Sequence, residues 1–287
     1  MSEATAPGRL AVLARFLEIQ NLGLNLPFAL AFLFLASAGW PSWEKLLWIV
    51  VAFVAARNAG HSFNRWTDRA QDARNPRTQE RALVTGRLSP GFALGLALGS
   101  AAIVIVAAYF LSPLAFLLAP VAIAIVFGYS YTKRFTTATT AYLGLVEAIT
   151  PAAVFIAVVG ALPLAVLLAV AGMLAWGTAF ETVHSLGDME NDRAQGLRSF
   201  PVRFGIRASV RLVPALHAVA LGLLALFGIA IGLGLPYYLA LGAMGVVAAY
   251  GDAELARNPT ATRGPFRRHF LLGALYLAGT LAALFLV

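Results

Sequence analysis

Nine long apolar runs divide this chain, and they constrain its fold more than any other feature. An α-helix needs roughly 20 apolar residues to cross the hydrocarbon core of a bilayer, so each run predicts a membrane-spanning helix. With 60% hydrophobic and 12% charged residues among 287, the chain is not an ordinary soluble domain. We expect an all-α integral membrane protein, with one domain over residues 1–287 and its helices bundled around a central cavity. The expected spans cover residues 10–37, 43–64, 91–111, 114–131, 139–160, 163–184, 209–233, 236–252 and 267–287.

The basic residues orient these spans. Lys and Arg gather in every second connector. On the side of the charge-poor connectors, the only basic residue is Lys45. Cytoplasmic loops carry an excess of Lys and Arg. We therefore expect the basic loops and the N-terminus in the cytoplasm and the C-terminus outside, in the plasma or inner membrane. The basic connectors cover residues 65–90, 132–138, 185–208 and 253–266.

Several function classes are disfavoured at this point. The net charge of +8 comes from arginines between apolar runs, not from a basic tail, so we expect no nucleic-acid partner. The chain has no cysteine, which excludes disulfides and thiolate chemistry. The first ten residues contain no clear cleavage site, so a removable signal peptide is not expected. No nucleophilic triad, phosphate-binding glycine loop or dinucleotide fingerprint is present.

A polar cluster follows the second apolar run. Asn64, Asp68 and Asp72 are spaced four residues apart; if the helix continues, they share one face. Oxygen ligands of this kind suit a hard divalent cation, and neighbouring guanidinium groups suit phosphate oxygens. The cluster therefore predicts a site for a metal and a diphosphate. The arginines around it are Arg65, Arg69, Arg74, Arg77, Arg81 and Arg87.

A second cluster follows the sixth run. The sequence NRWTDRAQ, which begins at Asn64, returns 124 residues later as DMENDRAQ, so Asn64 matches Asp188 and Asp68 matches Asp192. This indicates two pseudo-repeated four-helix units and a ninth helix, with one acidic cluster from each unit facing a shared cavity. The alternative is that these are solvated loop residues paired with arginines. Helical spacing also aligns Glu181 and His184 with the second cluster.

Three further groups are candidates. Tyr129, Lys133 and Arg134 close the fourth run on the side of the acidic clusters, where they either bind phosphate or serve as an aromatic and basic membrane anchor. Charges inside apolar runs cost free energy and therefore point to function, which applies to Arg57 and Glu181.

The third group is a polar stripe in the first run, which either lines a substrate pocket or forms hydrogen bonds between helices. Its residues are Arg15, Glu18, Asn21 and Asn25.

Three motifs together resemble the UbiA superfamily of intramembrane prenyltransferases. NRWTDRAQDARNPRTQERAL resembles its first aspartate-rich motif, ETVHSLGDMENDRAQGLRSFPVRFG its second, and GYSYTKR the Tyr-and-Lys motif between them. The segment DARNPRT is similar to the corresponding segment of the 4-hydroxybenzoate polyprenyltransferase subgroup. Three departures concern the acceptor: Arg65 stands where many members have Asp, and Glu181 and His184 stand where Asp and Tyr are more frequent.

The resemblance implies Mg²⁺-dependent transfer of a polyprenyl group from a polyprenyl diphosphate to an aromatic acid such as 4-hydroxybenzoate, in quinone biosynthesis. By this likeness the carboxylates are catalytic together with Lys133, cationic side chains neutralise the diphosphate, and the prenyl tail lies in an apolar groove open to the bilayer. The implied metal ligands are Asn64, Asp68, Asp72, Asp188 and Asp192. The implied substrate-binding residues are Asn64, Arg69, Tyr129, Arg134, Asn21, Glu181 and Arg57.

Alternatives stay open. Within the enzyme class, the acceptor is alternatively 1,4-dihydroxy-6-naphthoate of a menaquinone route or another lipophilic molecule. From a different class, a secondary transporter would also contain repeated helical units and intramembrane acidic residues. The grouping of the acidic residues at one membrane face, beside arginines, favours diphosphate chemistry.

Overall fold

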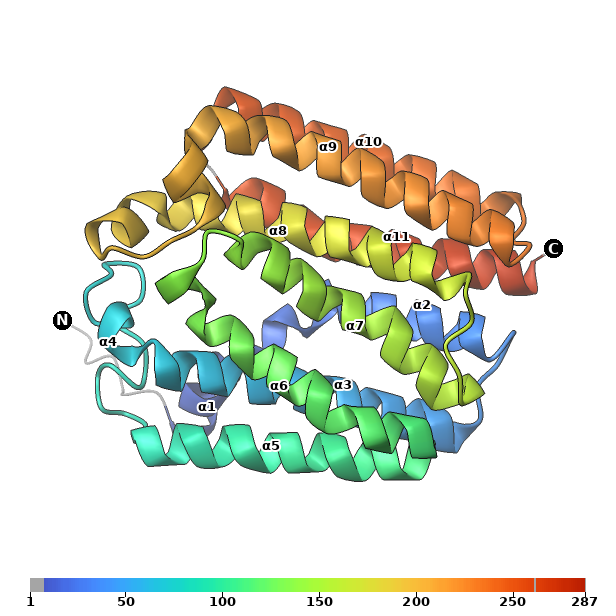
Figure 1. The fold of residues 1–287 in the computed structure, drawn as a ribbon, viewed down its shortest axis with the longest axis horizontal. Helices are drawn as coiled ribbons and strands as arrows, with labels where there is room; N and C mark the ends of the chain where they lie inside the picture. Colours follow the sequence, from blue (N-terminus) through green and yellow to red (C-terminus); the bar gives the residue numbers. More distant parts are fainter. Residues whose placement is uncertain (1–7, 261, 287) are drawn as a thin grey trace.

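The computed structural model describes residues 8–260 and 262–286, and this part of the chain folds into helices without a strand. Figure 1 shows long helices lying side by side along one direction. The predicted all-α class is confirmed. The helices are α1 (Arg9–Leu17), the 3₁₀ helix η1 (Ile19–Leu24), α2 (Leu26–Ala36), α3 (Trp43–Thr67), α4 (Arg69–Asp72), α5 (Pro90–Leu111), α6 (Pro113–Phe135), α7 (Thr139–Val159), α8 (Val166–Ala194), α9 (Phe200–Ala230), α10 (Leu235–Arg257) and α11 (Arg263–Phe285).

Serine caps begin several of the spans. The Oγ atoms of Ser42, Ser89, Ser112 and Ser199 accept hydrogen bonds from the third amide of α3, α5, α6 and α9, at 3.1 to 3.4 Å. Such a cap satisfies an amide that has no partner within the helix. In α5, α6 and α9, proline follows within the first two positions, where its missing N–H costs nothing. These short polar turns fix where each span starts.

Eight helices in the described residues are long and apolar enough to cross a membrane, and the first apolar run becomes a ninth span only as a bent pair. The pair consists of Leu10–Leu24 and Leu26–Ala36, which meet at 49°. Glu18 ends α1 in the left-handed conformation, with φ 46°, and Pro27 lies in the first turn of α2. The nine predicted spans are present, but the first is broken, not continuous.

The sixth predicted span ends too early, and the seventh begins too late. The structure extends α8 to Ala194 and begins α9 at Phe200, whereas the apolar pattern ends the sixth run at residue 184 and begins the seventh at 209. The predicted connector 185–208 is therefore mostly helical. Hydropathy detects only the part of a helix that faces lipid or core, and the last turns of α8 carry polar residues that face a cavity.

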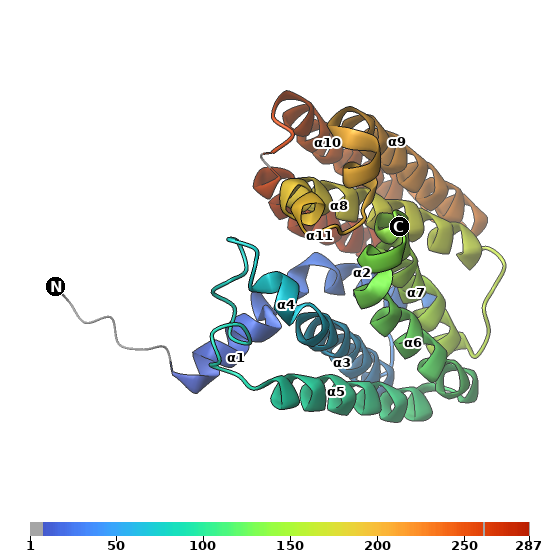
Figure 2. The ribbon, with the colours of Figure 1, turned by 60° about the vertical axis from the view of Figure 1, so that its left-hand side comes forward.

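The bundle has an aromatic core between α2, α8, α9 and α11. Phe28 of α2 contacts Trp176 of α8 and Tyr276 of α11, with ring centroids 5.9 and 5.3 Å apart, and Phe32 contacts Phe227 of α9 at 6.3 Å. Figure 2 shows α8 to α11 on one side and α3, α5, α6 and α7 on the other. The first half of the chain thus meets the second along α7 and α8, where Gly144 and Gly177 allow close approach.

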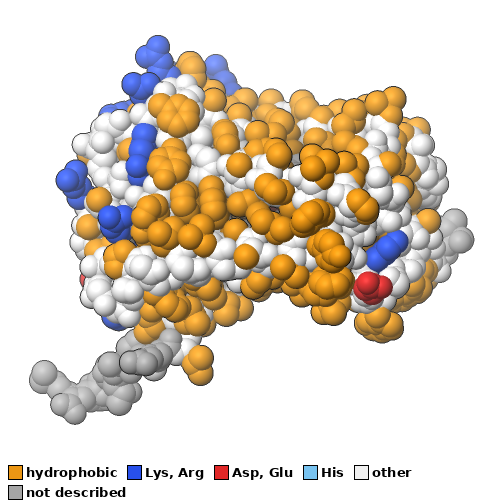
Figure 3. Space-filling view, turned by 60° about the horizontal axis from the view of Figure 1, so that its bottom comes forward, with side chains coloured by type: hydrophobic (Ala, Val, Ile, Leu, Met, Phe, Trp, Pro, Cys, Tyr) orange, Lys and Arg blue, Asp and Glu red, His pale blue; other side chains and the backbone are white. Residues whose placement is uncertain are grey.

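The surface fits a bilayer. Figure 3 shows an apolar band across the molecule, with most Lys and Arg side chains of this face gathered at one end. Large apolar side chains are exposed on several spans, for example Leu117 (70%), Leu239 (64%) and Val246 (72%). A soluble protein would not leave so continuous an apolar surface in water. The protein is an integral membrane protein.

Candidate functional site

A polar cavity of about 100 Å³ lies at the basic end of the bundle, where α3, α4, α6 and α8 converge. It brings together both acidic clusters and the end of α6, which are far apart in the sequence. The shared cavity expected from the two matching motifs is present, whereas the duplication of four-helix units stays a prediction. The lining residues are Asn64, Asp68, Gln71, Asp72, Asn75, Arg77, Arg81, Tyr129, Ser130, Lys133, Arg134, His184, Asp188, Asn191, Asp192 and Leu197.

The first acidic cluster does not lie on one continuous helix. α3 ends at Thr67, Asp68 forms the junction, and α4 begins at Arg69. Asn64 still lies next to Asp68, because its Nδ2 donates a hydrogen bond to the Asp68 carboxylate at 3.0 Å. The break turns the chain, and both carboxylates of the cluster still face the cavity.

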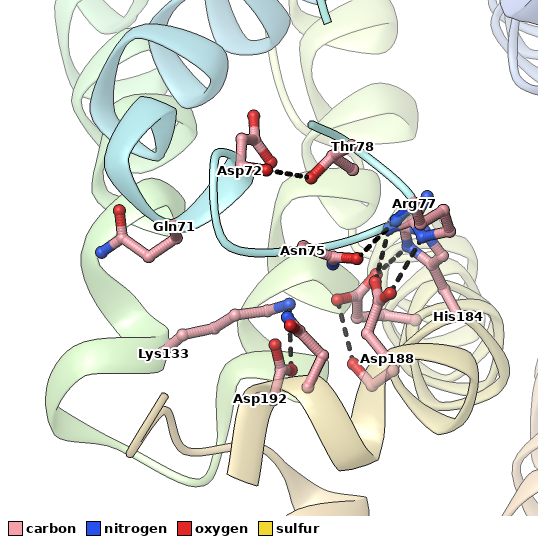
Figure 4. A network of polar contacts seen from close by, with 12 residues as sticks. Gln71, Asp72, Asn75, Arg77, Thr78, Lys133, His184, Asp188 and Asp192 are labelled. Atoms are coloured by element: carbon pink, nitrogen blue, oxygen red, sulfur yellow. Dashed lines mark hydrogen bonds and ion pairs between the residues drawn. The ribbon is translucent and has the colours of Figure 1, made fainter. Parts of the chain in front are cut away.

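Each of the four cavity carboxylates is paired with a cationic side chain. Arg77 donates to both oxygens of Asp188 at 2.9 and 2.6 Å, and Arg81 to Asp72 at 2.7 Å. Lys133 lies 3.4 Å from Asp192, and Arg134 lies 3.4 Å from Asp68. Figure 4 shows the contacts of Arg77 and Lys133 converging from three segments of the chain. The cavity therefore combines groups that suit a cation with groups that suit an anion.

The segment after α4 folds back over the cavity and supplies two of these cations. The Thr78 hydroxyl donates to the Asp72 carbonyl at 3.0 Å, and Asn75 Oδ1 accepts from the Arg77 amide at 2.9 Å. These bonds fix the turn from which Arg77 reaches α8. The sequence analysis placed Arg77 and Arg81 near the cluster but did not include them among the site residues. The sequence signal that could have included them was their positive charge close to the acidic cluster.

Tyr129 is held by a buried carboxylate. Its hydroxyl donates to Glu181 Oε1 at 2.9 Å, and the Ser185 hydroxyl donates to the same oxygen at 3.2 Å. His184 Nδ1 lies 3.3 Å from the other oxygen. Glu181 is only 1% exposed and does not line the cavity. It lies behind the cavity wall, where it orients Tyr129.

Asp68 lies outside the membrane-spanning helices. Burial raises the pKa of its carboxyl above the ordinary value, and the cations Lys133 and Arg134 only partly oppose this. Desolvation disfavours the charged form of a carboxyl group. An additional cation next to Asp68 would therefore stabilise its ionised form.

Besides Glu181, three other predicted substrate residues lie outside the polar cavity. The guanidinium of Arg57 donates to the carbonyls of Leu17 and Glu18 at 2.7 and 3.1 Å, at the break in the first span. Asn21 donates to the Glu18 carboxylate at 2.8 Å. Arg69 is exposed and donates to the carbonyl of Trp66. None of the three lines the polar cavity.

A second cavity, apolar and of about 230 Å³, lies deeper in the bundle between α3, α5, α6 and α7. Along α6 it follows directly after the polar cavity, since Tyr129 to Arg134 line the first and Ala115 to Phe127 line the second. Along α3, Ala59 and Ala56 likewise follow Asn64. Alanine is frequent in its wall, and small side chains leave space between helices.

The donor set of the polar cavity fits a hard divalent cation. Carboxylates and an amide oxygen are the ligands that Mg²⁺ prefers in proteins, and α3, α4 and α8 supply them. Among residues 8–260 and 262–286, no three acidic or histidine side chains surround a common point as metal ligands would. The ion pairs explain this spacing, because each carboxylate turns toward its own Arg or Lys.

Comparison with known proteins gives close relatives over most of the chain. The model of the UbiA prenyltransferase family matches residues 25–272. A 4-hydroxybenzoate octaprenyltransferase from Cupriavidus metallidurans is 33% identical over 283 residues, which are 96% of this chain and 95% of the relative. A protein of the same name from Methylobacillus flagellatus is 32% identical and covers 88% of this chain and 85% of the relative.

Solved structures share the fold. A UbiA homologue from Aeropyrum pernix K1 has a TM-score of 0.83 at 29% identity, over 91% of this chain and 97% of that one. A UbiA homologue from Archaeoglobus fulgidus, bound to GPP and Mg²⁺, has a TM-score of 0.71 at 19% identity, over 95% and 99%; this second likeness concerns the fold alone. From the family model and the near full-length relatives, we conclude that this chain belongs to the UbiA prenyltransferase family.

Proposed function

We propose that this protein transfers a polyprenyl group from a polyprenyl diphosphate to 4-hydroxybenzoate in quinone biosynthesis, as a single domain over its whole length. The names of its relatives support this acceptor, and 1,4-dihydroxy-6-naphthoate is the alternative. Family membership favours the enzyme over the secondary transporter. The acidic residues also lie at one end of the bundle, whereas transporter sites lie near the middle of the membrane.

One observation carries the proposal: the polar cavity and the apolar cavity follow one another along α6 and α3. The apolar cavity is called the groove from here on. A prenyl diphosphate has the same two parts, an anionic head and a hydrocarbon tail. The head fits the cavity of Lys133, Arg134, Arg77 and Arg81, and the tail fits the alanine-lined groove. The reacting carbon joins head and tail, so it would lie near Tyr129, between the two cavities.

Mg²⁺ is the cation that we propose for the polar cavity. Its ligands would be Asn64, Asp68, Asp72, Asp188 and Asp192, which come from both acidic clusters. When bound, Mg²⁺ supplies positive charge that stabilises the departing diphosphate. Solved UbiA homologues bound to Mg²⁺ with GPP or DMAPP support this choice.

The cationic side chains would bind the diphosphate oxygens. Arg77, Arg81, Lys133 and Arg134 already face the cavity, and guanidinium groups bind phosphate in paired hydrogen bonds. Their present carboxylate partners would then be available to the metal. Arg69, which is exposed beside this region, would add attraction at the entrance. As the allylic carbon–oxygen bond breaks, these groups stabilise the charge that develops on the leaving group.

The acceptor would lie deeper, toward Arg57 and Asn21. Arg57 is a cation inside the membrane whose guanidinium donates hydrogen bonds to the backbone carbonyls of Leu17 and Glu18, so its charge is available to an acidic acceptor. As the bond to the diphosphate breaks, a ring carbon ortho to the hydroxyl would bond to the allylic carbon, and a base would then take up the ring proton. Glu181 would act by keeping Tyr129 at the junction of the two cavities. The surrounding helices exclude water, which would otherwise capture the allylic cation.

The proposed orientation follows the distribution of basic residues. The polar cavity and the N-terminus would face the cytoplasm, and the C-terminus would lie outside. The donor would enter from the bilayer, because its tail groove lies among membrane-spanning helices.

The test is a transfer assay with purified protein in detergent. A radiolabelled prenyl diphosphate and Mg²⁺ are offered with 4-hydroxybenzoate or with dihydroxynaphthoate, and EDTA is the control. We expect Mg²⁺-dependent transfer of label to 4-hydroxybenzoate. Transfer to the naphthoate alone would replace the acceptor, and absence of both transfer and donor binding would contradict the proposal.

A further inference from the structure

Three exposed arginines follow one another at four-residue intervals at the beginning of α9. They are Arg203, Arg207 and Arg211, here called the arginine stripe. In the part of the chain that the structure describes, none of their guanidinium groups has a hydrogen bond or an ion pair, in contrast to the arginines of the polar cavity. The stripe lines neither of the two cavities.

Apolar side chains accompany the stripe on the same stretch of α9. Phe204 is 56% exposed and Ile206 is 37% exposed, and the ring of Phe204 packs on that of Phe200 at 4.7 Å. Gly205, with φ 80° and ψ 175°, interrupts the helix between Arg203 and Arg207. This bend is visible at the start of α9 in Figure 1. The segment therefore presents separate cations beside exposed aromatic and aliphatic groups.

We propose that the arginine stripe is a docking surface for the headgroups of anionic phospholipids of the surrounding membrane. Guanidinium groups bind phosphate oxygens in paired hydrogen bonds, and basic residues next to a membrane span attract anionic lipids. The acyl chains of such a lipid would contact Phe204 and Ile206. This combination of apolar and electrostatic contacts is the one that holds amphipathic segments at a bilayer surface.

The charge pattern selects a phospholipid over the prenyl diphosphate. The polar cavity mixes carboxylates with cations, as a metal and its diphosphate together require. The arginine stripe has cations alone, placed on either side of the bend at Gly205, and this suits the single negative charge of one phosphodiester per arginine. The proposal does not depend on the proposed reaction.

The docking surface is joined to the polar cavity by the short connection from α8 to α9. Leu197 lines the cavity, and the Arg198 amide donates to the Lys133 carbonyl at 2.7 Å. Ser199 then caps α9. A lipid bound to the stripe would therefore stabilise the first turns of α9 and the cavity wall that precedes them.

The experiment compares lipid retention by the wild type with that of two charge-matched variants. In the stripe variant, Arg203, Arg207 and Arg211 are replaced by Gln. In the control variant, three exposed arginines on other segments are replaced by Gln, which gives the same change in net charge: Arg74, Arg257 and Arg267. Each protein is placed in nanodiscs of mixed phosphatidylglycerol and phosphatidylcholine, extracted gently, and its bound lipid is counted by native mass spectrometry.

We expect the wild type and the control variant to retain phosphatidylglycerol in preference to phosphatidylcholine, and the stripe variant to lose this preference by about fivefold or more. Phosphatidylglycerol should also raise the melting temperature of the wild type and of the control, but not of the stripe variant. Equal retention by all three proteins, or equal loss in both variants, would overturn the proposal.

Folding of the stripe variant is checked by its elution and melting temperature in phosphatidylcholine alone. Should it not fold, wild-type protein is measured at rising NaCl concentrations instead, because salt weakens exposed electrostatic contacts. Loss of the phosphatidylglycerol preference at high salt would support the docking surface, and a preference that salt does not change would overturn it.

Discussion

At the scale of single residues, the main feature of the site is that its carboxylates are already engaged. Asp192 lies 3.4 Å from Lys133 and is only 3% exposed, and Asp188 is paired with Arg77. A buried ion pair is costly unless the geometry is good, and buried pairs are therefore weak evidence for stability. These pairs are better explained by the ligands that both partners would bind.

Asp192→Asn should reduce turnover at least 100-fold while leaving the fold intact, because removal of one charge-stabilising group typically costs about 10²–10³ in rate. The measurement is label transfer at saturating donor, together with the melting temperature. Glu190→Gln is the control, because Glu190 is exposed on the same helix two residues earlier. Full activity in Asp192→Asn would contradict the assignment of Asp192 to the metal.

The sequence predicted the acidic residues of the site but not all their partners. Asp68 and Asp192 stand out because their spacing repeats and the chain has only 13 Asp and Glu among 287 residues. Arg77 and Arg81 reach the cavity only because the loop after α4 folds back, which depends on bonds such as that from Thr78 to the Asp72 carbonyl. Such a tertiary contact leaves no pattern in the spacing of residues along the sequence. The role of Glu181 behind Tyr129 was hidden for the same reason.

At the scale of elements, α6 connects the two cavities. Its last turns carry Tyr129 and Lys133, and its middle carries Ala119 and Ala122 in the groove wall. The position of one helix would thus set both the head and the tail environment of the proposed donor. The length of the groove along α6, from Ala115 to Phe127, is about 18 Å at a rise of roughly 1.5 Å per residue.

Ala119→Phe should discriminate between donors by length, because Ala119 is 6% exposed and lines the groove. Filling the groove should lower kcat/KM for a long prenyl diphosphate about tenfold or more and affect a two-isoprene donor less. Ala124→Phe is the control, since Ala124 is exposed on the same helix and lies outside the groove. Equal loss with both donors would place the tail elsewhere.

Hydropathy predicted which elements exist but not where all of them end. It correctly indicated nine spans, yet it missed the break at Glu18, because no apolar pattern records a left-handed residue. Lys45 was the exception to the charge pattern, and the structure gives its reason: the Nζ atom donates to the Val158 carbonyl at the end of α7, at 3.0 Å. An end of a helix has unpaired carbonyls, and a lysine is a suitable partner.

At the scale of the whole molecule, the orientation in the membrane can be measured directly, because the chain has no native cysteine. Leu164 is 82% exposed in the connection between α7 and α8, and Arg74 is exposed near the polar cavity. In intact cells, a membrane-impermeant thiol reagent should label Leu164→Cys but not Arg74→Cys. In inverted vesicles the result should be reversed. The same labelling of both positions in intact cells would contradict the proposed orientation.

The pairing of every cavity carboxylate would also couple the binding of the two proposed ligands, Mg²⁺ and the diphosphate. A cation binding alone would leave Arg77 and Arg81 without partners, and a diphosphate binding alone would leave Asp72 and Asp188 without theirs. When both bind, each satisfies the groups that the other releases. Thermodynamic linkage then requires that each raises the affinity of the other by the same factor, typically about 5- to 150-fold.

This linkage is measurable by calorimetry. The dissociation constant of the donor should rise at least tenfold when Mg²⁺ is removed by EDTA, and that of Mg²⁺ should rise by the same factor when the donor is absent. Donor binding that is indifferent to EDTA would show that the two ligands do not share these side chains. If the factors agree, the ion pairs keep either ligand from occupying the cavity firmly by itself.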